Sequence, residues 1–134
     1  MGYAFDAAFS NLDLWVRKGA PPPRAQPLQV KAPGTPQATI AADQFGSGLG
    51  GVRSPYVEVP AATYFTTSPG PGTCREMGHK ALFDSARIKS LYGSSKNYAS
   101  KVAQSVNRLV KERWLTESDG RRIKAEAAGL SAVQ

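Results

Sequence analysis

The positions of the prolines divide this chain into three parts. All ten prolines lie between Pro21 and Pro71, and none occurs in the first 20 or the last 63 residues. Because proline removes a backbone hydrogen-bond donor and breaks helices, the two flanks are free to be helical and the middle is not. Residues 19–72 also hold 8 of the 13 glycines. The sequence therefore predicts helical flanks around a long irregular segment.

The first flank has the pattern of one amphipathic helix at 3–18. Its large apolar side chains recur at spacings of four, three and four residues, at Phe5, Phe9, Leu12 and Val16. This spacing places them on one face of a helix. A glycine followed by three prolines at 21–23 is a strong stop signal for that helix.

The last flank predicts three helices, at 84–92, 95–115 and 117–128. Asp84 is placed to cap the first of them, and Ser94 or Ser95 the second. The second has a continuous apolar stripe at helical spacing, formed by Tyr98, Val102, Val106, Leu109, Val110 and Trp114. Thr116 and Asp119 resemble a capping box, with Asp119 in place of the usual Glu, and predict the start of the third helix.

The middle segment, residues 19–80, shows neither helical nor strand periodicity over most of its length. Two short stretches, 38–41 and 57–59, have strand character and are bounded by turn residues. Long irregular loops are uncommon in compact domains, and this one carries several aromatic and β-branched side chains that linkers usually lack. We therefore expect the segment to lie over a surface supplied by something else, and residues 1–134 to form a single partial domain.

The composition limits the size of the core and the kinds of site. Leu, Ile, Val and Phe number only 26 of the 134 residues, and the net charge of +7 opposes compaction. No apolar run approaches the roughly 20 residues that span a bilayer, and the first 19 residues do not resemble a secretory signal. The compartment is left open. One cysteine and one histidine exclude a disulfide framework and a Cys- or His-rich metal site, and no cofactor is expected.

The positive charge is concentrated in the second half of the chain. Residues 1–67 carry a balance of +1 and residues 68–134 a balance of +6. A basic half indicates either a nucleic-acid or anionic-surface partner or the solvated face of helices. We favour the solvated face and do not favour nucleic acid, because no nucleic-acid-binding signature accompanies the charge and no aromatic residues are interleaved with it.

Two motifs suggest chemistry, and the residues around each weigh against it. Residues 46–51 match the G-x-G-x-x-G spacing of a dinucleotide-binding loop, but Pro55 is expected to forbid the helix that must follow it. We interpret the motif as a glycine-rich turn. Cys74 and His79 are separated by four residues in a Gly/Pro-rich stretch, without a third residue to orient them, and we expect no shared role. The nucleophile-elbow pattern G-x-S-x-G does not occur, so no catalytic residue is assigned.

Asp43, Gly50, Gly51 and Arg53 are the candidate site residues of this chain. Arg53 could bind an anionic group, or it could pair with Asp43 or Glu58 and bond backbone carbonyls. We favour the second role, in which these four residues pin the long loop.

The run from Asp43 to Tyr64, DQFGSGLGGVRSPYVEVPAATY, resembles the C-terminal region of a bacterial alpha/beta-hydrolase-domain protein family with esterase-like members. Flanking elements agree in order, and the resemblance covers about residues 5–128. These elements are Asn11–Val16 with Gly19 and Pro21-Pro22, Phe83-Asp84, Leu91-Tyr92-Gly93, Tyr98 and Leu109-Val110.

The resemblance implies an α/β fold class by inheritance, with an isolated chain that is mainly helical and has one or two short strands. In such families the nucleophile elbow and the base histidine lie upstream of this region, so no catalytic residue is carried over and enzyme activity is left open. The implied function is a non-catalytic C-terminal segment or subunit of a carboxylic-ester hydrolase, whether from a split gene, a truncated frame or a separate subunit. Its expected partner is the catalytic portion, or a second copy through self-association. The alternatives are a small basic helical module for nucleic acid or an anionic surface, and an autonomous enzyme using Cys74 and His79.

Overall fold

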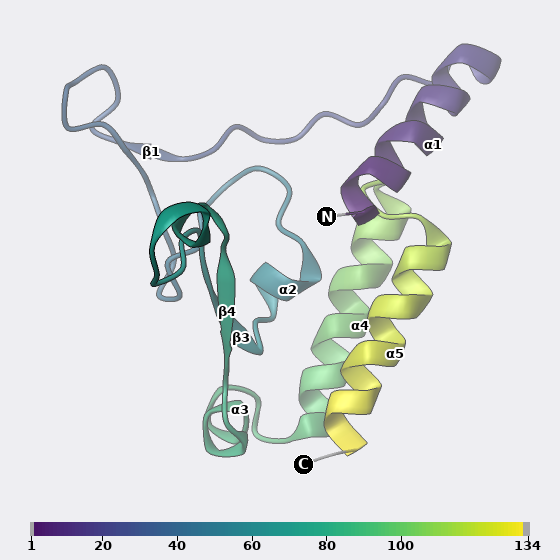
Figure 1. Cartoon of the computed structure of the whole chain (residues 1–134). Helices are drawn as coiled ribbons and strands as arrows, with labels where there is room; N and C mark the ends of the chain where they lie inside the picture. Colours follow the sequence, from purple (N-terminus) through teal and green to yellow (C-terminus); the bar gives the residue numbers. More distant parts are fainter. Residues whose placement is uncertain (1, 133–134) are drawn as a thin grey trace.

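The computed structural model describes residues 2–132, and about half of the chain is helical (Figure 1). In chain order the elements are α1 (Gly2–Lys18), β1 (Val30–Lys31), β2 (Thr39–Ile40), α2 (Pro55–Glu58), β3 (Ala62–Phe65), the 3-10 helix η1 (Gly72–Glu76), β4 (His79–Leu82), α3 (Ser85–Tyr92), α4 (Ser95–Lys111) and α5 (Glu117–Ala132). Residues 2–132 therefore contain four short strands rather than one or two. They pair as two antiparallel hairpins, β1–β2 and β3–β4.

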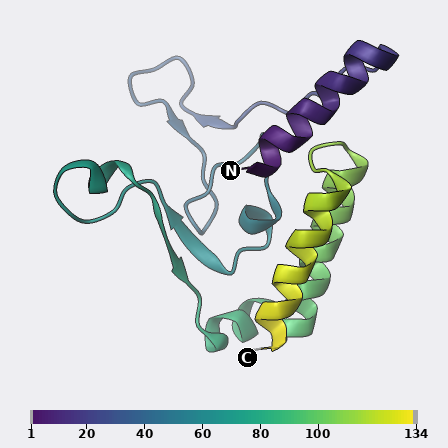
Figure 2. The same cartoon turned by 45° about the vertical axis from the view of Figure 1, so that its right-hand side comes forward.

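The core lies between α4 and α5, which run side by side in both views (Figures 1 and 2). The apolar stripe of α4 points inward, and Val106 and Leu109 are almost completely buried. From α5, Ile123 and Ala127 pack against it. At Gly120 the helices approach so closely that a β-carbon would lie 3.0 Å from methyl groups of both Val106 and Val110. This glycine therefore sets the close spacing of the two helices.

The starts of the C-terminal helices are fixed by side-chain caps. Asp84 accepts a hydrogen bond from the backbone N–H of Arg87 at 2.7 Å, and Ser94 accepts one from Asn97 at 3.1 Å. At the start of α5, the Thr116 hydroxyl oxygen accepts a hydrogen bond from the N–H of Asp119, which is the first half of the predicted capping box. The second half is absent, because the Asp119 carboxylate accepts a hydrogen bond from the Thr116 hydroxyl and not from the backbone.

The helix expected over 95–115 ends at Lys111, four residues early. Arg113 adopts a left-handed backbone conformation with φ of 64°. The N–H of Trp114 then bonds the carbonyl of Leu109 at 2.8 Å, and the N–H of Arg113 bonds that of Val110 at 3.0 Å. These two bonds form a Schellman motif, which closes the helix and usually requires glycine at this position. Because this position holds an arginine and not a glycine, nothing in the sequence indicated that the helix ends here.

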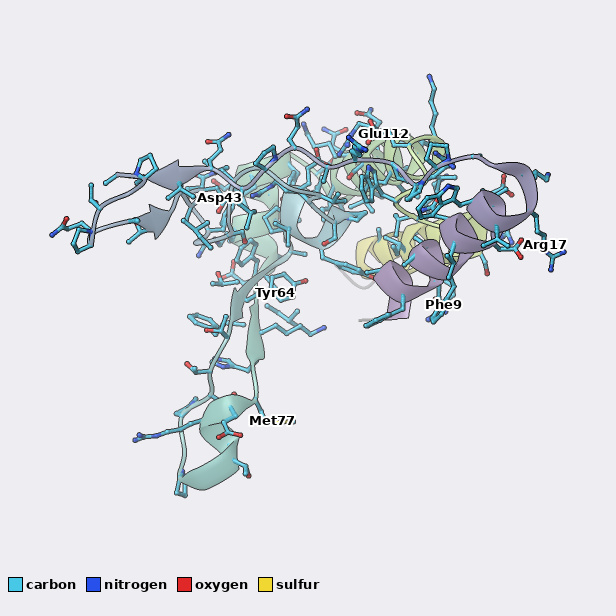
Figure 3. All side chains as sticks on the ribbon, turned by 90° about the horizontal axis from the view of Figure 1, so that it is seen from above. Phe9, Arg17, Asp43, Tyr64, Met77 and Glu112 are labelled. Carbon is cyan, nitrogen blue, oxygen red and sulfur yellow. The ribbon has the colours of Figure 1, made fainter. Side chains whose placement is uncertain are left out.

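The first helix packs with a face that its apolar periodicity did not indicate. Ala7 and Asn11 are its buried residues, and the Asn11 amide donates to the backbone carbonyl of Arg113 at 2.8 Å. This bond places α1 over the end of the α4–α5 pair (Figure 2). The stripe of Phe5, Phe9, Leu12 and Val16 is exposed instead. Figure 3 shows Phe9 and Arg17 directed away from the other elements.

The strand predicted at 57–59 is wrong, because residues 55–58 form the short helix α2. Pro55 is its first residue, where the missing N–H has no helical partner to lose and the fixed φ suits a helix. The argument that Pro55 forbids a helix at this point is therefore also incorrect. The strand of this region is β3, at 62–65, which pairs with β4 in a hairpin that projects from the body, with Met77 near its tip (Figure 3). Where 38–41 was expected to be a strand, β2 covers 39–40.

Candidate functional site

The four candidate residues lie together in one loop. The Arg53 guanidinium donates to the Asp43 carboxylate, to the carbonyl of Gly48 and, at 3.2 Å, to that of Val57. The side chains of Asp43 and Arg53 are only 17% and 21% exposed, so the pair is less screened by solvent than a surface pair. The guanidinium thus joins chain positions from 43 to 57, and it makes no bond to Glu58, the other acid considered for it.

The Asp43 carboxylate is held by more than its ion pair. It accepts the backbone N–H of Phe45 at 2.8 Å and that of Ser47 at 3.0 Å. Burial acts to raise the pKa of Asp43, but the hydrogen bonds from Arg53, Ser47 and Phe45, together with the Arg53 charge, outweigh it and lower that pKa below its ordinary 3.8. The carboxyl is therefore ionised at neutral pH and acts as a fixed acceptor.

Gly50 and Gly51 let a second segment pass close to this loop. Both have positive φ, 82° and 63°. A β-carbon on Gly50 would lie 2.3 Å from the carbonyl oxygen of Pro27, and the N–H of Gly51 bonds the carbonyl of Gln26 at 3.0 Å. Only glycine combines this conformation with this approach. The helix α2, which follows these glycines, has only four residues and is too short for the phosphate-binding helix of a dinucleotide site. The Arg53 guanidinium, which could have bound an anionic ligand, is paired with the Asp43 carboxylate.

A second polar cluster, which the sequence analysis missed, links α2 to α4. Glu58 at the end of α2 accepts a hydrogen bond from the Ser105 hydroxyl and, at 2.7 Å, one from the Arg108 guanidinium. Arg108 also donates to Glu112 at 3.1 Å. The spacing of Ser105 and Arg108, one helical turn apart, could have indicated a shared acceptor, but nothing in the sequence pointed to Glu58.

Several basic side chains of α4 and α5 are paired with acidic or polar ones. Besides Arg108, the pairs are Arg121 with Glu117, Arg122 with Asp119, and Lys124 with Asn107. Pairing of this kind is typical of a solvated helical surface. It gives no separate support to the nucleic-acid or anionic-surface alternative.

Cys74 and His79 lie on the projecting hairpin without a hydrogen bond between them. Cys74 is exposed in η1. His79 stacks on Phe65 with ring centroids 4.6 Å apart, and its Nδ1 lies 2.8 Å from the carbonyl oxygen of Thr67 and 3.3 Å from the Ser68 hydroxyl. A carbonyl only accepts, so the shorter contact is a hydrogen bond when Nδ1 carries the proton, and Nδ1 is then no base for Ser68.

Ser68 itself, which the sequence did not single out, donates its hydroxyl to the carbonyl of Met77 at 2.6 Å. An activated serine would instead donate to a histidine that is oriented by an acid. The hairpin therefore shows neither a cysteine nor a serine prepared for nucleophilic attack.

An apolar cavity of about 540 Å³ lies between α1 and the turn that joins α4 to α5. Its walls include Ala7, Asn11 and Trp15 from α1, Pro55 from α2, and Trp114 and Leu115 from the turn. No charged side chain lines it. Its volume lies in the range of small-molecule sites, which are mostly apolar.

A tyrosine–carboxylate cluster stands beside this cavity. The Tyr56 hydroxyl donates to Glu126 at 2.5 Å, and the Tyr3 hydroxyl donates to the same carboxylate at 3.3 Å. Burial and the Glu126 carboxylate raise the pKa of Tyr56 far above its ordinary value, because both disfavour the phenolate. The two tyrosines line the cavity wall and connect α1 and α2 to α5.

Within residues 2–132 no group of three or more His, Cys, Asp or Glu side chains is placed to hold a metal ion. Among the helices of that range, none combines the length and apolarity needed to cross a membrane.

A family model for the alpha/beta hydrolase domain matches residues 1–125, almost the whole chain. No curated protein and no solved structure matches the sequence significantly. The family assignment therefore rests on the sequence match alone and not on likeness to a solved structure. On that match, the chain belongs to the alpha/beta hydrolase domain family.

Proposed function

We propose that this chain is a non-catalytic part of an alpha/beta hydrolase acting on carboxylic esters, and that it works with a catalytic portion that supplies the nucleophile and its base. Its contribution is structural. The outer face of α1 binds the catalytic portion, while the Arg53 loop and the α4–α5 pair hold that face in place.

The observation that carries this proposal is the exposed apolar stripe of α1. Phe5 is 63% exposed, Phe9 68% and Val16 78%. Single exposed apolar residues are normal, whereas several on one face of one helix indicate a surface that is covered in the working protein. Aromatic residues such as these two phenylalanines are enriched at the centres of protein interfaces.

The polar groups of the chain support a non-catalytic role. Ester hydrolysis by this class of fold requires a serine whose proton passes to a histidine. The only histidine of the chain, His79, bonds a backbone carbonyl, and the neighbouring Ser68 hydroxyl is directed to another. Family membership supports the proposed reaction class, and the local geometry favours another segment as the source of the nucleophile.

The test is reconstitution. The neighbouring reading frames are searched for a polypeptide with the G-x-S-x-G motif, which is co-expressed with the chain, and both co-purification and hydrolysis of p-nitrophenyl butyrate are measured. The lack of such a frame would count against the proposal. We expect a complex that hydrolyses the ester, and no turnover by this chain alone. The double variant Phe5→Ser with Phe9→Ser should weaken association at least tenfold, because it removes the central apolar contacts of the interface.

Ser10→Lys is the matched control, since Ser10 is exposed on the same helix but outside the stripe. It should leave association unchanged. Turnover by the chain alone that disappears with His79→Ala would contradict the non-catalytic role. Association that is unaffected by the double variant would show that α1 is not the interface, and a stable dimer of the chain that excludes the other polypeptide would mean that a second copy covers the stripe.

A further inference from the structure

We propose that the cavity beneath α1 is a binding site for a small, uncharged, largely hydrocarbon molecule. Most of this site differs from the proposed interface, because Ala7 and Asn11 face inward on α1 whereas Phe5, Phe9 and Val16 face outward. Leu12 of the stripe belongs to both, since it also lines the cavity.

The first argument is the size of the cavity. The cavity of about 540 Å³ has the size of small-molecule sites. It is partly open, and Leu12, Trp15 and Val52 of its lining are 51%, 53% and 42% exposed, so its apolar walls are left in contact with water. Water gains few hydrogen bonds against such walls. An apolar occupant would remove this contact.

The second argument is the absence of charge in the lining. Its polar side-chain groups are hydroxyls, two indole N–H groups and one amide, and no Lys, Arg, Asp or Glu is among the lining residues. A carboxylate or ammonium group would enter without a counter-ion and would lose its hydration. The lining therefore selects neutral ligands against charged ligands of the same size.

The third argument concerns the single buried polar residue in the wall. Asn11 is 5% exposed, and its amide nitrogen donates to the Arg113 carbonyl. Among the described residues no fully buried side-chain nitrogen or oxygen lacks a hydrogen-bond partner, so the Asn11 amide oxygen, with its two lone pairs, is accessible to solvent and is not an orphaned acceptor. It can accept a hydrogen bond from one hydroxyl or N–H of the ligand. We therefore expect a hydrocarbon body that carries a single neutral donor.

The chain contains its own reporter for this site. Its only two tryptophans, Trp15 and Trp114, both line the cavity. The experiment titrates the full chain with 8-bromo-1-octanol, a neutral quencher that has one hydroxyl, and follows tryptophan fluorescence. The matched probe is 8-bromo-octanoate, of the same length but charged at neutral pH. We expect saturable quenching by the alcohol and at least tenfold weaker binding of the carboxylate.

Two variants distinguish the cavity from non-specific contact. Ala8→Leu enlarges a side chain of the lining and should weaken binding of the alcohol at least fivefold, whereas Ala128→Leu enlarges an exposed side chain of α5 outside the lining and should not. Binding of the alcohol should also raise the unfolding midpoint of the chain.

Non-saturable quenching, equal binding of alcohol and carboxylate, or indifference to Ala8→Leu would each overturn the proposal. Quenching that is lost as the chain dimerises at higher concentration would also overturn it, because a second copy would then fill the cavity. Failure of reconstitution would not affect these results, so the two proposals stand or fall separately.

Discussion

Replacing Arg53 with alanine tests whether the loop from 43 to 57 depends on one side chain. The change removes the ion pair with Asp43 and the bonds to the carbonyls of Gly48 and Val57. It leaves Asp43 with two backbone N–H donors, so the carboxylate is not orphaned. The loss therefore falls on the loop conformation and not on the α4–α5 core.

The magnitude follows from the number and the exposure of the lost bonds. Hydrogen bonds to charged groups contribute about 1.5–3 kcal/mol each, and partial exposure and the remaining donors reduce their sum. About 2–3 kcal/mol is expected for Arg53→Ala. Since about 1.4 kcal/mol corresponds to a factor of ten, the loop should open roughly 30 to 150 times more often.

Amide hydrogen exchange measures this opening at single residues. The protected amides of Leu49 and Gly51, which bond carbonyls across the loop, should exchange faster by that factor, while Val106 in α4 should change little. Arg17→Ala is the control, because the Arg17–Asp13 pair has side chains 75% and 56% exposed and should contribute at most about 0.5 kcal/mol. Exchange of Leu49 and Gly51 within threefold of the unmodified chain would refute the pinning role.

Three further changes have definite expected outcomes. Gly50→Ala should destabilise the loop by at least about 2 kcal/mol in the same exchange experiment, because φ is positive and the added β-carbon would collide with the carbonyl of Pro27. Gly34→Ala is the control: its φ is similar but the added β-carbon meets open space, so it should cost only about 1 kcal/mol. Leu109→Ala should lower the free energy of unfolding by about 2–5 kcal/mol in urea, against less than about 0.5 for the exposed Leu82→Ala; equal effects would place the core elsewhere. Because the folded pKa of Asp43 is lowered, its contribution to stability is complete above the ordinary value of 3.8 and is lost as the pH falls through the folded pKa. The stability difference between the chain and Asp43→Asn should therefore be constant near neutral pH and shrink as the pH falls below 3.8.

The sequence predicted elements whose signals are local. Asp84 and Ser94 cap helices where their side chains indicated it, and Gly19, with φ of 66°, follows the last residue of α1. The apolar stripe of α4 faces the core because α5, its covering partner, is its neighbour in the chain. In these places the interactions that determine the structure are formed between residues that are close in the sequence or between neighbouring helices.

Elsewhere the deciding partner is remote in the sequence. The periodicity of α1 identified a helix but not the face that packs, since Asn11 is held by a carbonyl 102 residues away. Glu58 meets Arg108 across 50 residues, and Tyr56 meets Glu126 across 70. Arg113 takes a conformation that usually marks glycine, so the end of α4 had no visible signal. The cavity is formed by residues that are remote in the sequence, so no local sequence pattern predicts it.

The long sequence separation of the α1 contacts also bears on the order in which the chain folds. The α4–α5 hairpin closes through a turn of a few residues, and its loop-closure entropy is small. The docking of α1 through Asn11 and Tyr3 closes loops of more than one hundred residues. Because local contacts form first, we expect α4–α5 to fold early and α1 to dock last. During synthesis and refolding, α1 therefore stays undocked longest, and a partner that binds its outer face at that stage would meet it before its inner face has packed on the rest of the chain.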